Sequence, residues 1–294
     1  MRMNKGFKKK ESRIKRQIQR LGFLFLDEPL GTFGAVLFLI VISMAVASPL
    51  WTDKSPTAVS IPNVFKPPSS EFWFGSDNLG RDVWSRFVYG SRTSLLVGIS
   101  SILMASLAGG MLGIFSGLIG GKVDLIIQRI MDALLSMPAI VLAILIMAVL
   151  GTSVFNTILA IAVAYFPRIN RLTRSTAISL RESLFVESAI VAGASKIRIS
   201  IMHVAPNCIA PWLVYATALL GTAFLAEATL SFLGLGVPPP IPSWGRDLAE
   251  NLTNFEFAPW LCIFPGLGIT MAVFAANFLG DSMRNIFDPR LKKA

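Results

Sequence analysis

The sequence predicts an all-α polytopic membrane protein with six transmembrane helices and with both termini in the cytoplasm. Of its 294 residues, 53% are hydrophobic and only 15% are charged, and the mean hydropathy is +0.63. A soluble domain carries about 25% charged residues. The apolar residues gather in runs of about twenty, the length of helix that crosses a hydrocarbon core of about 30 Å. Most of the basic residues lie in the segments that would share one side of the membrane.

Each of six apolar segments is long enough to span a membrane, and none shows the ten-residue alternation of a membrane β-strand. We place the spans at 31–51, 94–118, 131–151, 153–172, 208–233 and 260–281. The first run is too long for the core of a cleavable signal peptide. The remaining parts are a basic cytoplasmic or interfacial arm, an outer loop, a five-helix core and a cytoplasmic tail, at 1–30, 52–93, 94–283 and 284–294 respectively.

The distribution of Lys and Arg predicts the orientation of the spans. Most of the 27 basic residues lie in the N-terminal arm, in the loops that follow the second and fourth spans, and in the tail. The outer side holds only Lys54, Lys66, Arg81, Arg86, Arg92 and Arg246. Both termini are therefore expected in the cytoplasm. Anionic lipid beside the first span explains the basic arm, so the net charge of +10 does not indicate nucleic acid.

Glycine and proline mark features inside the spans. The second span carries glycines at four-residue spacing, which leaves one helix face as bare backbone for close packing, at Gly109, Gly113, Gly117 and Gly121. Pro138 in the third span and Pro167 at the end of the fourth are expected to kink or end their helices.

Ionisable residues are nearly absent at mid-depth of the spans, which disfavours a proton-coupled carrier. Glu227, near the outer end of the fifth span, is either a residue of a transport path or a capping or interhelical contact, and we favour the contact. Asp132 is expected to begin the third span. Cys208 and Cys262 lie near opposite faces and should not pair. One histidine, His203, without other ligands at metal spacing predicts no metal site.

The chain carries no motif for catalysis or for nucleotide binding. It contains no G-x-x-x-x-G-K-[ST], no H-E-x-x-H and no G-x-S-x-G. If the protein moves a solute uphill, the energy therefore has to come from another chain.

The cytoplasmic loop at 184–207 is too polar and too punctuated to be a span. It reads LFVESAIVAGASKIRISIMHVAPN. We expect two short helices with a bend at Gly193, where glycine allows a sharp turn at low steric cost. Exposed apolar residues of this loop, such as Ile190 and Val191, need a cover.

Two outer segments have distinct patterns. Residues 74–96, FGSDNLGRDVWSRFVYGSRTSLL, begin with a turn-forming run and continue as an amphipathic helix with Trp84 and Phe87. Residues 231–245, SFLGLGVPPPIPSWG, lead into an outer loop at 234–259. Three consecutive prolines favour polyproline II there, and Trp244 is expected to anchor at the surface.

Four segments in the right order resemble permease subunits of bacterial ABC importers. The loop at 184–207 is similar to their EAA loop, through Glu187, Ser188, Ala189, Gly193, His203 and Pro206. The segments 74–96, 231–245 and 280–291 (GDSMRNIFDPRL) resemble the second permease subunit of dipeptide, oligopeptide and nickel importers. The outer-loop signature is carried by Asp77, Gly80, Arg81 and Asp82. The family often has Ala in place of Ser188 and Leu in place of Ala205.

This resemblance implies the type I ABC importer permease fold in the inner (plasma) membrane of a prokaryote. It implies a non-catalytic chain that forms half of a translocation path, with no cofactor of its own and with ATP and Mg bound by a partner. The implied partners are a second homologous permease subunit, two ABC ATPase subunits, an external solute-binding protein and the lipid membrane. The EAA loop is expected to dock on an ATPase, where Glu187 pairs with a basic group of that partner or of its own loop.

Peptides are the cargo that the resemblance favours. Nickel or other metal chelates, glutathione and oligosaccharides are the alternatives carried by relatives. A self-sufficient secondary transporter or channel is disfavoured, because the sequence shows neither inverted repeats nor intramembrane charges. A membrane-embedded enzyme is disfavoured because no catalytic constellation is present.

Overall fold

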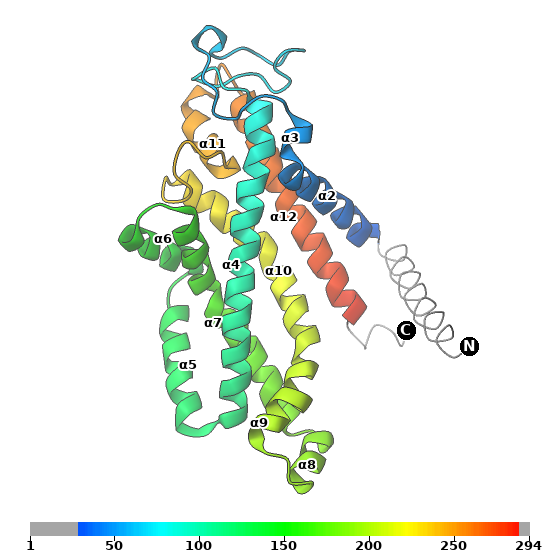
Figure 1. Ribbon diagram of the computed structural model, residues 1–294. Helices are drawn as coiled ribbons and strands as arrows, with labels where there is room; N and C mark the ends of the chain where they lie inside the picture. Colours follow the sequence, from blue (N-terminus) through cyan, green and yellow to red (C-terminus); the bar gives the residue numbers. More distant parts are fainter. Residues whose placement is uncertain (1–28, 288–294) are drawn as a thin grey trace, which may run out of the picture.

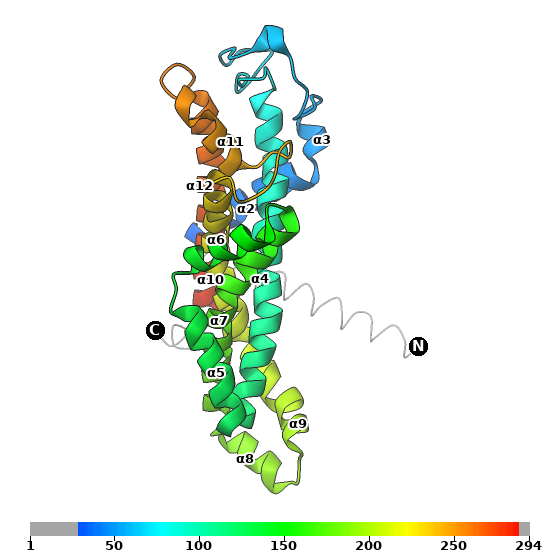
Figure 2. The same ribbon diagram turned by 90° about the vertical axis from the view of Figure 1, so that its left-hand side faces the viewer.

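The computed structural model describes residues 29–287, and that part of the chain is helical, without a β-strand (Figure 1). The predicted N-terminal arm lies mostly outside the described residues, as does most of the tail. Figures 1 and 2 show an elongated bundle with the outer loops and α11 at one end and with α8 and α9 at the other. The helices are α2 (Pro29–Val46), α3 (Ser48–Trp51), α4 (Val83–Ile119), α5 (Gly121–Leu135), α6 (Ala139–Leu150), α7 (Val154–Arg181), α8 (Leu184–Val191), α9 (Lys196–Ile199), α10 (Ala205–Phe232), α11 (Trp244–Asn251) and α12 (Trp260–Phe287).

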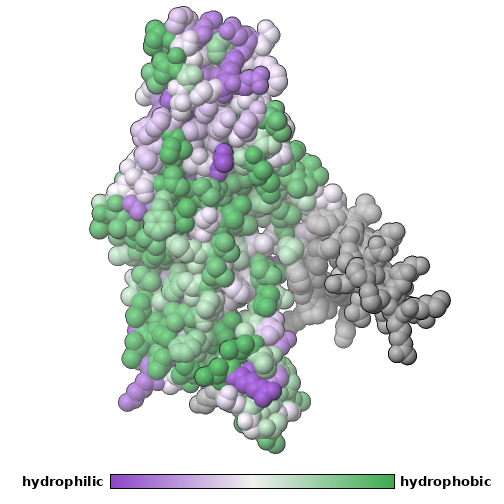
Figure 3. Space-filling model, viewed as in Figure 1, coloured by the Kyte–Doolittle hydropathy of each residue, from purple (hydrophilic) through white to green (hydrophobic). Residues whose placement is uncertain are grey.

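Four stretches of helix are long and apolar enough to cross a membrane: α2, α4, Ile197–Phe232 and α12. The bent pair α5–α6 provides a fifth if it counts as one span. Apolar side chains cover the body of the molecule, whereas hydrophilic ones gather at the outer-loop end, which we call the head (Figure 3). The chain is thus built as a multi-pass membrane protein.

The predicted third span, 131–151, is interrupted where Pro138 was expected to kink or end the helix. The chain breaks at Ser136–Pro138, and α5 and α6 meet at 89°. Proline lacks a backbone N–H and disfavours the α conformation of the residue before it, so Pro138 ends one helix and precedes the next. Asp132 consequently lies in the last turn of α5, not at a helix start, and accepts a hydrogen bond from Arg171 of α7 at 2.7 Å.

The first span is also divided, because α2 ends at Val46 and α3 begins at Ser48 with a proline in its first turn. By contrast, α4 joins two predicted helices into one. We expected an amphipathic helix followed by a span from residue 94, but a single 37-residue helix begins at Val83. At 1.5 Å per residue it is about 55 Å long, enough to connect the head to the opposite end of the bundle, near α8 and α9.

Helix α7 packs closely against the glycines of α4, whose four-residue spacing predicted a close contact with another helix. A Cβ added to Gly109 would lie 2.7 Å from the carbonyl oxygen of Phe166, and one added to Gly117 would lie 2.8 Å from that of Arg174. At Gly113 the nearest atom would be the Thr173 hydroxyl, at 2.1 Å. Gly121 does not share this role, because α4 has already ended and nothing lies within 4 Å.

Helix α7 continues through Pro167 and ends at Arg181, beyond the predicted end at 172. It is 28 residues long but is not among the four stretches that are long and apolar enough to cross a membrane, since its second half carries Arg and Asn residues. It packs against α4, α6 and α10 in an apolar core that contains Ile161, Tyr165 and Ile169. The helix is therefore apolar at its start and more polar towards its C-terminal end.

Candidate functional site

The loop at 184–207 has the predicted form of two short helices with a bend. Helix α8 ends at Val191, and Gly193 adopts a φ of +78°, which L-residues rarely adopt. Nothing lies within 4 Å of a Cβ added there, so the backbone conformation, not lack of space, favours glycine. Helix α9 then leads through a π-helical turn, Ser200–Val204, into α10.

One face of this loop is packed against the ends of α4, α7 and α10. Val186, Ile199 and Val204 are buried in one cluster with Ala177 and Cys208. Ala189 and Ala194 pack against the same cluster from the loop, and Ile114 and Leu118 do so from α4. The loop is therefore a rigid extension of the bundle rather than a detached tether.

The opposite face of the loop is exposed and apolar. Val191 is 89% exposed and Leu184 is 80% exposed, which is unusual for side chains of this kind. Further exposed apolar side chains of the loop are Phe185, Ile190, Ile197, Ile201 and Met202. This surface requires a covering partner or lipid.

The polar residues predicted for the loop are arranged around that surface. Glu187 and Ser188 are exposed, and the Ser188 hydroxyl donates to the carbonyl oxygen of Leu184 at 2.8 Å. Glu187 has no ion-pair partner among the side chains that the structure describes. His203 is half-buried, and its carbonyl oxygen accepts from the Asn207 amide at 2.6 Å. Pro206 is exposed in the first turn of α10.

At the head, the predicted outer-loop residues form a tight turn. One carboxylate oxygen of Asp77 accepts the backbone N–H groups of Leu79 and Arg81, each at 2.9 Å, and the other accepts the Arg81 side chain at 2.6 Å. Gly80 has a φ of +68°, and a Cβ there would lie 1.8 Å from the carbonyl oxygen of Ser60. Asp82 caps α4 by accepting from the Ser85 backbone at 2.8 Å.

Beyond this turn, a buried network of ion pairs joins the first outer loop to α11. The guanidinium of Arg86, 4% exposed, is bonded to Asp247 and lies 3.9 Å from Asp77. Arg81 reaches Glu250 at 3.4 Å. Burial raises the pKa of Asp247, and the nearby charge of Arg86 opposes that shift. We predicted Asp77 and Arg81, but the sequence did not reveal Asp247, which is 161 residues from Arg86.

Trp244 is buried, not at the surface, and the expectation that it anchors there is wrong. Its ring lies against Phe87, and its indole N–H donates to the Phe87 carbonyl oxygen at 2.8 Å. A Cβ on Gly268 of α12 would lie 2.6 Å from the ring, so α4, α11 and α12 enclose it closely. An indole whose N–H finds a backbone partner can be buried without loss of hydrogen bonding.

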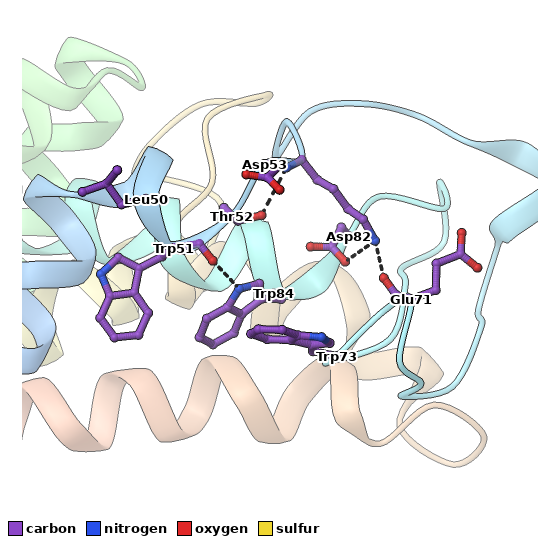
Figure 4. A pocket seen from close by; sticks show the side chains of 9 residues that line it. Leu50, Trp51, Thr52, Asp53, Glu71, Trp73, Asp82 and Trp84 are labelled. Atoms are coloured by element: carbon purple, nitrogen blue, oxygen red, sulfur yellow. Dashed lines mark hydrogen bonds and ion pairs between the residues drawn. The ribbon is translucent and has the colours of Figure 1, made fainter.

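Figure 4 shows a pocket of about 290 Å³ at the foot of the first outer loop. Its aromatic wall contains Trp51, Trp73 and Trp84, and the Trp84 indole donates to the Trp51 carbonyl oxygen at 2.9 Å. Above these rings, Lys54 lies 3.6 Å from Asp82 and donates to the carbonyl oxygen of Glu71. Such an aromatic cluster is typical of the membrane–water interface.

Glu227 is 1% exposed and lies between α4 and α10. It accepts hydrogen bonds from Ser94 at 3.0 Å and from Ser231 at 2.9 Å. This geometry is that of an interhelical polar contact. Cys208 and Cys262 are free and buried, and within residues 29–287 no group of three or more His, Cys, Asp and Glu residues is arranged to hold a metal ion.

A second polar network, which the sequence did not predict, links α5 to α7 towards the end of the bundle that carries α8 and α9. Arg174 donates two hydrogen bonds to Asp124, each at 2.6 Å. Gln128 donates to Asn170 at 3.2 Å, and Arg171 pairs with Asp132. Its only sequence signal is the spacing of Asp124, Gln128 and Asp132, which places them on one helix face.

Comparison with known proteins agrees with this arrangement. Residues 109–293 match the family model described as binding-protein-dependent transport system inner membrane component. A putative peptide transport system permease protein of Brucella suis is 44% identical over 259 residues, 88% of this chain and 87% of the relative. The dipeptide transport system permease protein DppC of Alkalihalophilus pseudofirmus is 41% identical over 90% of this chain and 86% of its own length. The probable D,D-dipeptide transport system permease protein DdpC of Escherichia coli is 36% identical, with 92% and 91% covered.

Proposed function

Because the chain belongs to the family of inner membrane components of binding-protein-dependent transport systems, we propose that it is the permease subunit of an ATP-driven peptide importer. The names of its relatives support peptides as the cargo. The observation that carries coupling to an ATPase is the loop at 184–207, which is packed on one face and exposes apolar side chains on the other. A groove of a partner protein would cover that face.

The loop transmits motion because it is short, rigid and continuous with the bundle. An ATPase that displaces α8 and α9 also displaces the ends of α4, α7 and α10, on which they pack. Glu187, exposed and without a described ion-pair partner, is available to a basic group of the ATPase. The proposal gives Ser188, Ala189, Gly193, His203 and Pro206 the task of shaping this docking element.

The complete importer contains partners that supply what this chain lacks. We assign ATP and Mg binding and hydrolysis to two ATPase subunits, and no cofactor or catalysis to this chain. A second, homologous permease completes the path, and an external solute-binding protein delivers the cargo at the head. We assign α7 as the sixth span, which places both termini in the cytoplasm of a prokaryotic cell, inside the inner membrane.

Reconstitution tests the proposal. The chain is co-expressed with its neighbouring transporter genes, purified in complex and placed in liposomes with the binding protein outside and ATP inside. We expect uptake of radiolabelled dipeptides or oligopeptides that requires both ATP and the binding protein. A chain that purifies without an ATPase would overturn the proposed coupling. A complex that takes up a nickel chelate, glutathione or an oligosaccharide but no peptide would overturn the proposed cargo.

A further inference from the structure

The cytoplasmic half of α7 presents a narrow polar stripe, which consists of Arg168, Arg171, Ser175 and Ser179. Residues 156–167 of this helix are all buried or half-buried, and exposure begins at Arg168. The four stripe residues are separated by three or four positions, so they lie on one face. Arg181, also exposed, lies on a different face of the helix.

This stripe is out of place for a helix surrounded by lipid. Arg168 is fourteen residues beyond Val154, about 21 Å along the helix, which is less than the hydrocarbon thickness of about 30 Å. Charged residues within spans almost always face the interior of the assembly or a water-filled cavity. Three of the stripe residues, Arg168, Arg171 and Ser175, also line a hollow of about 490 Å³, together with Leu135 of α5 and Tyr215 of α10.

The charges in this hollow do not balance. Arg171 is neutralised by Asp132 at 2.7 Å. Arg168 lies over the ring of Tyr165, 5.4 Å from its centroid, and has no carboxylate partner among the described residues. The guanidinium of Arg168 therefore carries an unbalanced positive charge. This planar group can donate two parallel hydrogen bonds to one carboxylate.

We propose that the α7 stripe and Tyr215 form an anion subsite on the translocation path, which binds the terminal carboxylate of a peptide in transit. The inference rests on the proposed function, since peptides of every sequence share this one anionic group. Arg168 holds the carboxylate, and Tyr215 lines the same hollow. Ser175 lines it too, but its hydroxyl donates to the carbonyl oxygen of Leu172 at 2.8 Å, so it is not counted as a donor to the anion. A phosphate of an anionic lipid is the competing occupant with the same charge.

Uptake by the reconstituted importer distinguishes these occupants. A dipeptide with a free C-terminus is compared with its C-terminal amide in wild type and in Arg168→Gln, both at saturating binding protein. Within each peptide the ratio of variant to wild type cancels the preference of the binding protein. We expect Arg168→Gln to lower uptake of the free acid about tenfold and to leave uptake of the amide unchanged.

Two further variants sharpen the result. Arg168→Lys keeps the positive charge but not the paired donors of the guanidinium. It should recover part of the free-acid uptake that is lost in Arg168→Gln. Arg181→Gln removes an exposed charge from the same helix but another face, and should leave the ratio of acid to amide uptake as in wild type. An equal loss for both peptides in Arg168→Gln would overturn the subsite.

The lipid alternative is tested by repeating the uptake in liposomes with and without phosphatidylglycerol. A defect of Arg168→Gln that disappears without anionic lipid would assign the site to lipid and overturn our inference. If the wild-type complex takes up no peptide at all, the proposed function itself fails. If wild type takes up peptides but Arg168→Gln does not discriminate the acid from the amide, only the subsite fails.

Discussion

Replacing Asp247 by Asn tests whether the buried ion pairs hold the head together. The Arg86 guanidinium is almost fully buried, and after the change its remaining carboxylate is Asp77, at 3.9 Å. Removal of one partner from a buried pair costs about 3–5 kcal/mol, because the other charge stays buried. The remaining attraction of Asp77 and the hydrogen bond from Arg86 to the Pro56 carbonyl oxygen, at 3.2 Å, place the expected loss near the lower limit, about 3 kcal/mol.

A thiol-reactive fluorophore in detergent measures this loss. Cys262 is buried, with its sulfur 3.4 Å from the Asn251 carbonyl oxygen at the end of α11, so its labelling reports opening of the head. Cys208→Ser removes the other cysteine and serves as the background. The midpoint is the temperature at which labelling of Cys262 is half complete. A loss of about 3 kcal/mol corresponds to a fall in this temperature of about 6–12 °C for a protein of 150–250 residues.

Glu250→Gln is the matched control. Its carboxylate is 29% exposed and pairs with Arg246 at 2.6 Å and with Arg81 at 3.4 Å; because partly exposed ion pairs contribute little, the expected cost is about 1 kcal/mol. The double variant Arg86→Met/Asp247→Leu removes both charges and should recover most of the stability lost in Asp247→Asn. If Asp247→Asn shifts the midpoint no more than Glu250→Gln does, the network does not hold the head and the reasoning is refuted.

Three further substitutions test the coupling loop and the α4–α7 contact. Gly193→Val forces a β-branched residue to a φ of +78° at a cost of about 1–2 kcal/mol, and should uncouple peptide-stimulated ATP hydrolysis without loss of membrane insertion; Gly193→Asn, which tolerates this conformation, is the control. Glu187→Arg should weaken copurification of the ATPase. Unchanged copurification and unchanged coupling would show that the charge of Glu187 has no part in binding the ATPase. Gly113→Ala places a Cβ 2.1 Å from the Thr173 hydroxyl and 2.5 Å from the Asn170 carbonyl oxygen, so it should lower the midpoint of unfolding by several degrees. Gly266→Ala, whose nearest neighbour would be 3.8 Å away, should leave the midpoint unchanged, and equal effects of the two would contradict the packing argument.

The sequence predicted those features that depend on local pattern. The helical class follows from the apolar runs, the close approach of another helix to α4 from the four-residue spacing of glycines, and the bend of the loop at 184–207 from Gly193. That the approaching helix is α7 was not predicted. The turn around Asp77 was predicted for the same reason, because an Asp side chain bonds to the backbone a few residues on. None of these requires knowledge of a distant segment.

Features that depend on contacts between distant segments were missed. Nothing local distinguishes the buried Trp244 from a tryptophan at the interface; only the Phe87 carbonyl and the space beside Gly268 decide it. Asp247 is one of several charged residues in an outer loop until α4 brings Arg86 to it. Pro138 predicted a break, but not the 89° angle at which α5 and α6 meet.

The long α4 connects the two functional ends of the molecule. At its outer end Asp82 and Arg86 bind it to the head, and at its inner end Ile114 and Leu118 pack against the core of the cytoplasmic loop. Gly109, Gly113 and Gly117 hold α7 against the last third of α4, and the chain passes from α7 through two residues into α8. A close-packed pair of helices moves as a body rather than deforming continuously. On the proposed coupling to an ATPase, we therefore expect a displacement of α8 to move α4 and α7 together, and Arg168 with them.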